Sequence, residues 1–225
     1  MNKILIVAAH PDDEILGCGG TIARLVKEGN IAYTLILGEG ITSRDKTRDA
    51  KKRKNEIEQL KKQTLQANKE IGVKKVFTYD YPDNRFDTVP FLDIVKTIEE
   101  VKDKIKPDMI YTHYCNDLNI DHKITYNAVI TATRPVKGEN VKEIYSFEVL
   151  SSTEWNYPLR FSPNVFFDIS KTLKKKVKAA SFYKSEMKKD FHPRSLEFIE
   201  LNAKNRGVKS GLKYAEVFEV VRVIK

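Results

Sequence analysis

Short apolar runs alternate with helical patterns along most of the 225-residue chain, and this alternation limits the folds that the chain can adopt. The segment 3–9 is almost continuously apolar, as expected for a buried parallel strand. Further strands are predicted at 31–37, 76–79, 109–113, 144–149, 165–168 and 217–223, and helices at 15–28, 44–72, 91–104, 121–133, 171–189 and 194–205. The order is typical of an α/β fold, here a Rossmann-like, mostly parallel sheet with helices on both faces. No composition shift marks a boundary, so residues 1–225 are predicted to form a single domain.

The composition excludes several classes of protein. No apolar run approaches the roughly 20 residues of a membrane span, and the 2 cysteines are too few for a disulfide framework. The chain starts with a strand and not with a signal-peptide pattern, so we expect a cytoplasmic protein. The net charge is +9, but acidic residues are interleaved with the lysines and no nucleic-acid motif is present, so no nucleic-acid partner is expected. The charge agrees better with a basic rim that attracts an anionic small molecule.

Titratable residues follow two of the predicted strands at the point where each strand ends. His10, Asp12 and Asp13 come directly after the first strand, while His113 and His122 lie at and after the end of the fourth. In open parallel sheets, ligands bind at the carboxyl ends of the strands. We therefore expect the two clusters to converge on one crevice.

The residue types in the first cluster suit metal chemistry. Pro11 biases His10 toward an extended backbone, and neighbouring side chains of an extended segment point to opposite sides, so Asp12 and Asp13 can do different work. Two histidines and one aspartate with an open position are suited to catalytic zinc. The simpler alternatives are that Asp12 or Asp13 caps the following helix and that His113 is a structural histidine.

The motifs "AHPDDE" and "NIDH" resemble those of the PIG-L/LmbE-like family of zinc-dependent N-deacetylases. The segments "YPDNRFD", "DHKITYNAVITATRP", "EIYSFEVLSSTEW" and "HPRSLEFIE" resemble the bacterial branch found with nucleotide-sugar and surface-glycan biosynthesis, so the resemblance covers most of the chain. It implies a hydrolase that removes an acetyl group from an N-acetylated sugar or sugar conjugate, a nucleotide-sugar being one candidate. The implied cofactor is Zn²⁺, with another divalent metal such as Fe²⁺ as the alternative.

Carried over by position, the resemblance makes His10, Asp13 and His122 the metal ligands. Asp12 becomes the general base that takes a proton from the attacking water. Asp121 becomes a partner that orients a histidine ligand.

Five further residues are candidates for roles around the site. Many family members carry a histidine where this chain has Asn119, which cannot deliver a proton near neutral pH, so His113 is a candidate substitute. Asp83 and Arg85 lie in the loop after the third strand, and Arg85 is a candidate contact for a phosphate or a sugar hydroxyl. His192 is a candidate for a substrate wall or for a subunit contact in a homo-oligomer.

The favoured function is therefore an amide hydrolase for a polar, anionic N-acetylated sugar derivative. Its rival is a Rossmann-like nucleotide- or sugar-binding protein without hydrolytic activity. Stoichiometric zinc in the purified protein, lost in the variant His10→Ala, would favour the hydrolase. A basic nucleic-acid-binding protein would instead show steeply salt-dependent binding. The acyl group, the sugar and its carrier are not specified by the sequence.

Overall fold

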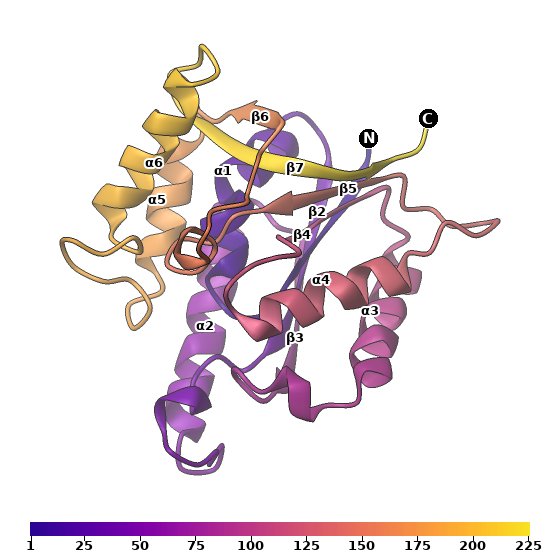
Figure 1. Ribbon diagram of the computed structural model, residues 1–225, viewed down its shortest axis with the longest axis vertical. Coiled ribbons are helices and arrows are strands. Elements are labelled where there is room, and N and C mark those ends of the chain that lie inside the picture. Colours follow the sequence, from indigo (N-terminus) through magenta and orange to yellow (C-terminus); the bar gives the residue numbers. More distant parts are fainter.

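The computed structural model describes residues 1–225 and confirms the α/β class. Seven strands form one sheet in the order β3-β2-β1-β4-β5-β7-β6 (Figure 1). The first five strands are parallel, whereas β7 runs antiparallel to both β5 and β6. The strands are β1 Lys3–Ala8, β2 Ile31–Gly38, β3 Lys75–Tyr81, β4 Met109–His113, β5 Glu143–Phe147, β6 Val165–Asp168 and β7 Ala215–Val223.

Helices cover both faces of the sheet (Figure 1). They are α1 Asp13–Lys27, α2 Lys54–Glu70, α3 Phe91–Ile105, α4 Ile120–Ala132, α5 Leu173–Ser181 and α6 Leu196–Val208, with short 3-10 helices at Thr42–Arg44, Phe86–Thr88 and Thr153–Trp155. Side chains of β1 alternate between two apolar cores, as expected for a strand that is buried on both sides. Ile4 and Ile6 pack with α1, α2, α5 and α6, while Leu5 and Val7 pack with α3 and α4. None of these helices is long and apolar enough to cross a membrane.

The strand order reverses next to β1, because β2 and β3 extend the sheet on one side and β4 and β5 on the other. The loops that follow β1 and β4 therefore diverge from neighbouring strand ends, which is where open α/β sheets form a ligand crevice. Gly17 lets α1 pack closely beside this crevice, since a Cβ atom there would lie 2.3 Å from Cδ2 of Phe147. The fold thus places the N-terminus of α1 at the carboxyl edge of the sheet.

Two boundaries near the site differ from the prediction. Helix α1 begins at Asp13 and not at Ile15, because the carbonyl oxygen of Asp12 already accepts hydrogen bonds from the N–H groups of Ile15 and Leu16 at 3.0 and 2.9 Å. The helix predicted over 171–189 ends at Ser181. The following residues, 182–195, cross the carboxyl edge as irregular chain and turn polar side chains toward the crevice.

The helix predicted over 44–72 is wrong in its first part, because α2 starts only at Lys54. Arg53 donates two hydrogen bonds to the carboxylate of Asp45, each of 2.8 Å, and thereby closes residues 45–53 into a loop. The apolar periodicity that predicted the helix is confined to its second part, where Leu60 and Ala67 enter the core.

Candidate metal centre and active site

The three predicted metal ligands come together at the carboxyl edge of the sheet. His10 and Asp13 follow β1, and His122 lies in the first turn of α4, which follows β4. All three are buried, and their ligand atoms lie within 4.8 Å of one another. The carboxylate Oδ2 of Asp13 is 3.5 Å from His10 Nδ1 and 3.2 Å from His122 Nε2.

A carboxylate holds the other ring nitrogen of each histidine. His10 Nε2 is 2.9 Å from Asp121 Oδ2, and His122 Nδ1 is 3.0 Å from Asp117 Oδ1. The remaining nitrogens, His10 Nδ1 and His122 Nε2, are the two that face Asp13. Carboxylate–histidine pairs of this kind orient metal ligands and raise their basicity.

Asp117 was not among the predicted site residues. It is fully buried and accepts hydrogen bonds from the hydroxyl groups of Ser152 and Thr153, which follow β5. Burial raises the pKa of Asp117, but the hydrogen bonds and the charge of His122 bring it down to about 2. The available sequence signal was an acidic residue five positions before His122, in the loop between β4 and α4.

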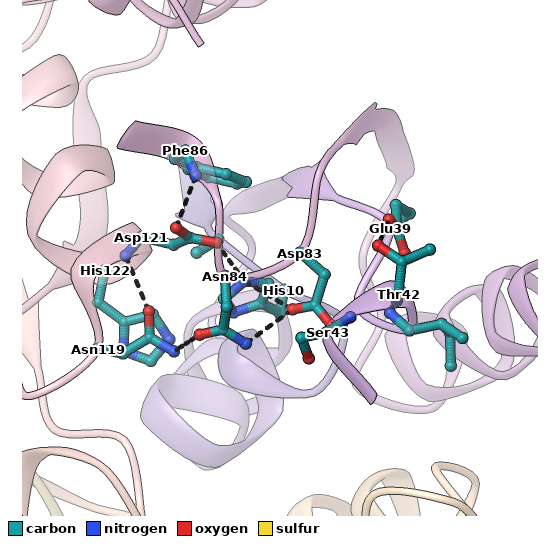
Figure 2. A network of polar contacts seen from close by, with 12 residues as sticks. His10, Glu39, Thr42, Ser43, Asp83, Asn84, Phe86, Asn119, Asp121 and His122 are labelled. Atoms are coloured by element: carbon teal, nitrogen blue, oxygen red, sulfur yellow. Dashed lines mark hydrogen bonds and ion pairs between the residues drawn. The ribbon is translucent and has the colours of Figure 1, made fainter. Parts of the chain in front are cut away.

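The donor set fits a divalent ion such as zinc, which binds imidazole nitrogen and carboxylate oxygen and keeps an open position in catalytic sites. His10, Asp83 and Asp121 form a second group of potential ligand atoms within 4.8 Å. In that group Asp121 already accepts hydrogen bonds from the ring of His10 and from the N–H of Phe86, the latter at 2.9 Å (Figure 2). Both oxygens of Asp121 are thus in use, whereas the hydrogen bond from the N–H of His10, at 2.8 Å, reaches only Oδ2 of Asp13, so the group around Asp13 is the better candidate.

The metal-free cluster is strongly polarised. Burial acts to raise the pKa of Asp13, but the charges of His122 and His113 and the histidine hydrogen bonds hold it well below its usual value. Burial acts to lower the pKa of His122, yet Asp13 and Asp117 raise it to about 9. The pKa of His10 is also raised, because Asp121 and Asp13 outweigh its burial. The rings of His10 and His122 are therefore more basic than a free imidazole when no ion is bound.

Asp12 lies beside this cluster and has no partner within it. Its backbone is left-handed, with φ of 99° and ψ of −29°, and its side chain makes no capping hydrogen bond, so capping does not account for this residue. Its carboxylate lines the cavity and lies 3.4 Å from an amino nitrogen of Arg194. Burial and the charge of Asp13 raise the pKa of Asp12, while Arg194 lowers it. A strained, buried carboxylate at a cavity is typical of a functional residue.

Glu14 holds the backbone of Asp12 in place. Its Oε2 atom accepts a hydrogen bond from the N–H of Asp12 at 3.1 Å. Its Oε1 atom accepts from the side-chain amide of Asn68 at 2.8 Å and from the hydroxyl of Tyr183. Burial raises the pKa of Glu14 to about 7 against these hydrogen bonds. The conformation of Asp12 is therefore linked to α2 and to the segment after α5.

A chain of hydrogen bonds joins three strand-end loops beside the cluster (Figure 2). Asn119 accepts from the N–H of Asp121 and donates to Asn84 Oδ1, both at 2.8 Å. Asn84 donates to Asp83 Oδ1 at 3.0 Å, and Asp83 Oδ2 accepts from the N–H of Ser43 at 3.1 Å. Asp83 and Asn119 both line the cavity. Asn119 thus caps α4 and leaves no proton donor of histidine type at its position.

His113 lies beneath the cluster and not on the cavity surface. It is fully buried, and its Nε2 accepts a hydrogen bond from the N–H of Ala9 at 2.8 Å. Its ring stacks on that of His122, with centroids 3.9 Å apart. Burial and the charge of His122 hold the pKa of His113 well below its usual value. This geometry favours a structural histidine that supports the ring of His122.

The structure places Arg85 and His192 away from the cavity lining. Arg85 is half-buried at the start of a 3-10 helix, and its side chain forms no hydrogen bond or salt bridge. His192 lies edge-on to Trp155, with ring centroids 5.8 Å apart, and accepts a hydrogen bond from the N–H of Arg194 at 3.1 Å. His192 therefore contacts the cavity wall indirectly, through its neighbour.

A cavity of about 300 Å³ opens over the metal cluster. One wall comes from Glu186, Lys188 and Arg194, in the segment after α5, and Arg44 in the loop after β2 completes it. The sequence made His192 a candidate for a substrate wall, but linear spacing did not bring these four side chains together, because they come from segments that are far apart in the sequence.

A buried group of two histidines and one aspartate, at the carboxyl edge of a mostly parallel sheet, defines a candidate metal-dependent enzyme of Rossmann-like fold. Residues 5–133 match the family PIG-L, described as GlcNAc-PI de-N-acetylase. The chain belongs to this family, which confirms the family that the motifs indicated.

Proteins similar to this chain include deacetylases and a hydratase. The chain is 26% identical over 188 residues to a probable N-acetyl-alpha-D-glucosaminyl L-malate deacetylase 2 of Bacillus cereus, with 81% of this chain and 83% of the relative covered. The solved N,N'-diacetylchitobiose deacetylase from Pyrococcus horikoshii has a TM-score of 0.78 and 21% identity over 98% of this chain and 84% of that one. GalB, the 4-carboxy-2-hydroxymuconate hydratase of Pseudomonas putida KT2440, has a TM-score of 0.80 and 20% identity over 100% of this chain and 99% of that one. The fold alone therefore does not identify the reaction.

Proposed function

We propose that this protein is a zinc-dependent N-deacetylase that releases acetate from an N-acetylated sugar or sugar conjugate. The observation that carries the proposal is the buried group of His10, Asp13 and His122 with Asp12 beside it. The family description, GlcNAc-PI de-N-acetylase, supports an amide of an acetylated amino sugar as the bond that is cleaved. The relative from Bacillus cereus supports it further, since its name describes an acetylated glucosaminyl substrate.

His10, Asp13 and His122 would hold the ion through Nδ1, a carboxylate oxygen and Nε2. When bound, zinc supplies Lewis acidity, which polarises an amide carbonyl and makes water more acidic. Asp117 and Asp121 keep the ligand nitrogens turned inward, through contacts of 3.0 and 2.9 Å with the two rings. The polar cavity above the cluster admits the acetamido group.

Asp12 is the group placed to move protons. Its carboxylate accepts a proton from water as the water attacks the amide carbon, and it returns that proton to the nitrogen that leaves as the amine. Glu14 fixes the backbone of Asp12, and the guanidinium of Arg194, 3.4 Å away, favours its ionised form. Asn119 lacks a transferable proton, so Asp12 carries both proton transfers in this assignment.

The proposal is tested by measuring acetate release from a panel of N-acetylated sugars, sugar phosphates and nucleotide-sugars. Activity should require a divalent ion, disappear with a chelator and return on addition of zinc. Parallel reconstitution with Fe²⁺ without oxygen identifies which ion supports the higher turnover. A protein that binds these compounds but releases no acetate with either ion would instead be the binding protein without hydrolytic activity.

The metal content of purified variants tests which residues bind the ion. His10→Ala, Asp13→Ala and His122→Ala should each lose most of the bound metal, because each removes one of three protein ligands. His192→Ala is the matched control, since His192 lies outside the cavity lining. Full metal content in all three ligand variants would contradict the assignment.

A further inference from the structure

We infer that the wall formed by Arg44, Lys188 and Arg194 binds an anionic group, a phosphate or a carboxylate, that the acetylated sugar carries. The inference rests on the proposed function for the acetylated part of the substrate. The new element is the chemical class of the rest of the substrate, together with the residues that recognise it. All three side chains line the cavity that opens over the metal cluster.

Arg194 carries unused hydrogen-bonding capacity. Its guanidinium contacts Asp12 at 3.4 Å and Glu186 at 3.7 Å, both longer than a typical charge-assisted hydrogen bond. Its Nε atom is buried and has no hydrogen-bond partner. An unpaired buried donor is costly, and a guanidinium presents its donors in a planar fork that matches a carboxylate or a phosphate. An anion bound at Arg194 would supply the missing acceptor.

Glu186 arranges the wall. Its carboxylate accepts hydrogen bonds from Arg44 and, at 2.8 Å, from the hydroxyl of Ser185, and it is largely buried. Arg44 follows β2, whereas Arg194 precedes α6, so this one carboxylate brings two cations from distant segments to the same side of the cavity. The arrangement keeps both guanidinium groups beside the space in which a substrate would lie.

Lys188 adds a cation that no carboxylate neutralises. Its ammonium group donates to the carbonyl oxygen of Ser185 at 3.1 Å and forms no salt bridge. The side chain is exposed at the cavity. Lys188 is therefore free to meet a second oxygen of a bound phosphate or carboxylate, as lysines do at phosphate sites.

The local charge of the wall agrees with an anionic ligand. Three cationic side chains and four carboxylates line the cavity, namely Arg44, Lys188, Arg194, Asp12, Asp13, Asp83 and Glu186. Asp12, Asp13 and Asp83 lie at or beside the metal cluster, whereas Glu186 is the one carboxylate of the wall, so the wall itself carries three cations against one anion. A local excess of positive charge attracts anionic substrates.

The test compares three acetylated substrates on the zinc-loaded enzyme: methyl N-acetylglucosaminide, N-acetylglucosamine 1-phosphate and N-acetylglucosaminyl malate. The readout is the ratio of kcat/KM for each anionic substrate to that for the neutral one. Arg194→Gln should lower the ratio about tenfold or more, as expected for losing a charge-assisted contact, and Lys188→Gln about threefold. The matched control is Lys189→Gln, which removes the same charge from the next residue, outside the cavity lining.

A fall for only one of the two anions identifies phosphate or carboxylate as the recognised group. An unchanged ratio in Arg194→Gln overturns the inference, even if both rates fall, because Arg194 would then act only on the catalytic machinery. An equal fall in Lys188→Gln and Lys189→Gln also overturns it, since long-range charge would suffice. Calorimetry with N-acetylglucosamine 1-phosphate separates the anion site from the proposed deacetylase. If the protein binds this compound, loses the binding in Arg194→Gln and hydrolyses none of the substrates, the anion site is supported and the deacetylase is contradicted. No such binding and no such hydrolysis contradicts both.

Discussion

The metal cluster and the cationic wall face the same cavity but differ in how completely their polar atoms are paired. Around the metal cluster, the outer nitrogens of both histidine ligands have a carboxylate partner, at 2.9 and 3.0 Å. In the wall, the contacts of Arg194 are 3.4 and 3.7 Å long, and its Nε has no partner. The outer nitrogens of His10 and His122 are therefore paired before any ligand arrives, whereas Arg194 in the wall has a donor without a partner.

This difference follows from what each region must bind. An ion with short, directional bonds needs ligand atoms whose orientation is already set. A substrate group must bind and leave, so the residues that recognise it keep free donors and stay accessible to water. The side chain of Arg194 is 26% exposed, against 3% for His122, which agrees with these separate tasks.

The largest expected effect separates Asp12 from Asp13, adjacent residues with different partners. Asp12→Asn removes the proton acceptor but no metal ligand, so turnover should fall by roughly two to four orders of magnitude while the metal stays bound. Asp13→Asn replaces a carboxylate ligand by a neutral amide oxygen, so it should weaken metal binding and recover part of its activity at high zinc. Metal content and acetate release, measured for both variants across a zinc titration, check this assignment. Rescue of Asp12→Asn by zinc, without rescue of Asp13→Asn, would mean that the roles are reversed.

A smaller effect is expected from Asp117, whose contact with His122 Nδ1 at 3.0 Å would orient this proposed ligand without binding the ion. Asp117→Asn keeps the size of the side chain but removes the charge that holds His122 Nδ1. Zinc affinity should fall about 10- to 100-fold, the usual range for partners of ligating histidines. A competition titration against a chelator measures it, with Asp103→Asn on the exposed face of α3 as the control. Wild-type affinity in Asp117→Asn would show that the stack on His113 orients His122 without it.

The pH dependence of metal binding tests whether the cluster is as polarised as its contacts indicate. The pKa of His122 is raised from 6.5 to about 9, so an ion must displace a proton from this ring at neutral pH. Zinc affinity should therefore rise with pH, about tenfold per unit for each proton displaced. The native state binds this proton more tightly than the unfolded chain, so the stability gained is present below pH 6.5 and is lost between 6.5 and about 9. Buffered zinc titrations and denaturant curves of the metal-free protein at pH 6, 7 and 8 measure both slopes, and a zinc affinity that does not change with pH would contradict the raised pKa of His122.

The grouping of His10, Asp13 and His122 could be predicted from the sequence, whereas the residues that form the wall could be predicted only in part. His10 and Asp13 directly follow one strand and His122 follows another, and a parallel sheet brings such strand ends together whatever the details of the loops. Arg194 reaches the cavity only because the chain leaves its helix at Ser181 and crosses the edge of the sheet, and no local pattern records that path. The loop 45–53 was missed for a similar reason, since the Asp45–Arg53 pair closes it where helical spacing was expected. Local periodicity predicts elements well, but contacts between irregular segments depend on the assembled fold.

The smallest predicted effect concerns Tyr183, which joins the two regions, since it lies near the start of the segment 182–195 that forms the wall and its hydroxyl donates to Glu14. Tyr183→Phe keeps the ring in the core but removes one of three donors to a buried carboxylate, so unfolding should cost about 1 kcal/mol less. Because Glu14 also accepts from the N–H of Asp12, a looser Glu14 should let the strained backbone of Asp12 relax. We expect kcat to fall about three- to tenfold with little change in KM, since a positioned proton acceptor acts in the transition state and not in substrate binding.

Tyr145→Phe is the control for this prediction, because it removes a hydroxyl that donates to Glu143, outside the cavity lining. A purely structural role for Tyr183 predicts lost stability in Tyr183→Phe with kcat unchanged below the unfolding transition. A double-mutant cycle with Glu14→Gln distinguishes the two outcomes. Residues that act through one hydrogen-bonded unit should show effects on kcat that are far from additive. Additive losses would show that Tyr183 and Glu14 support the site independently, and the link from the wall to Asp12 would then have to run through the 3.4 Å contact with Arg194.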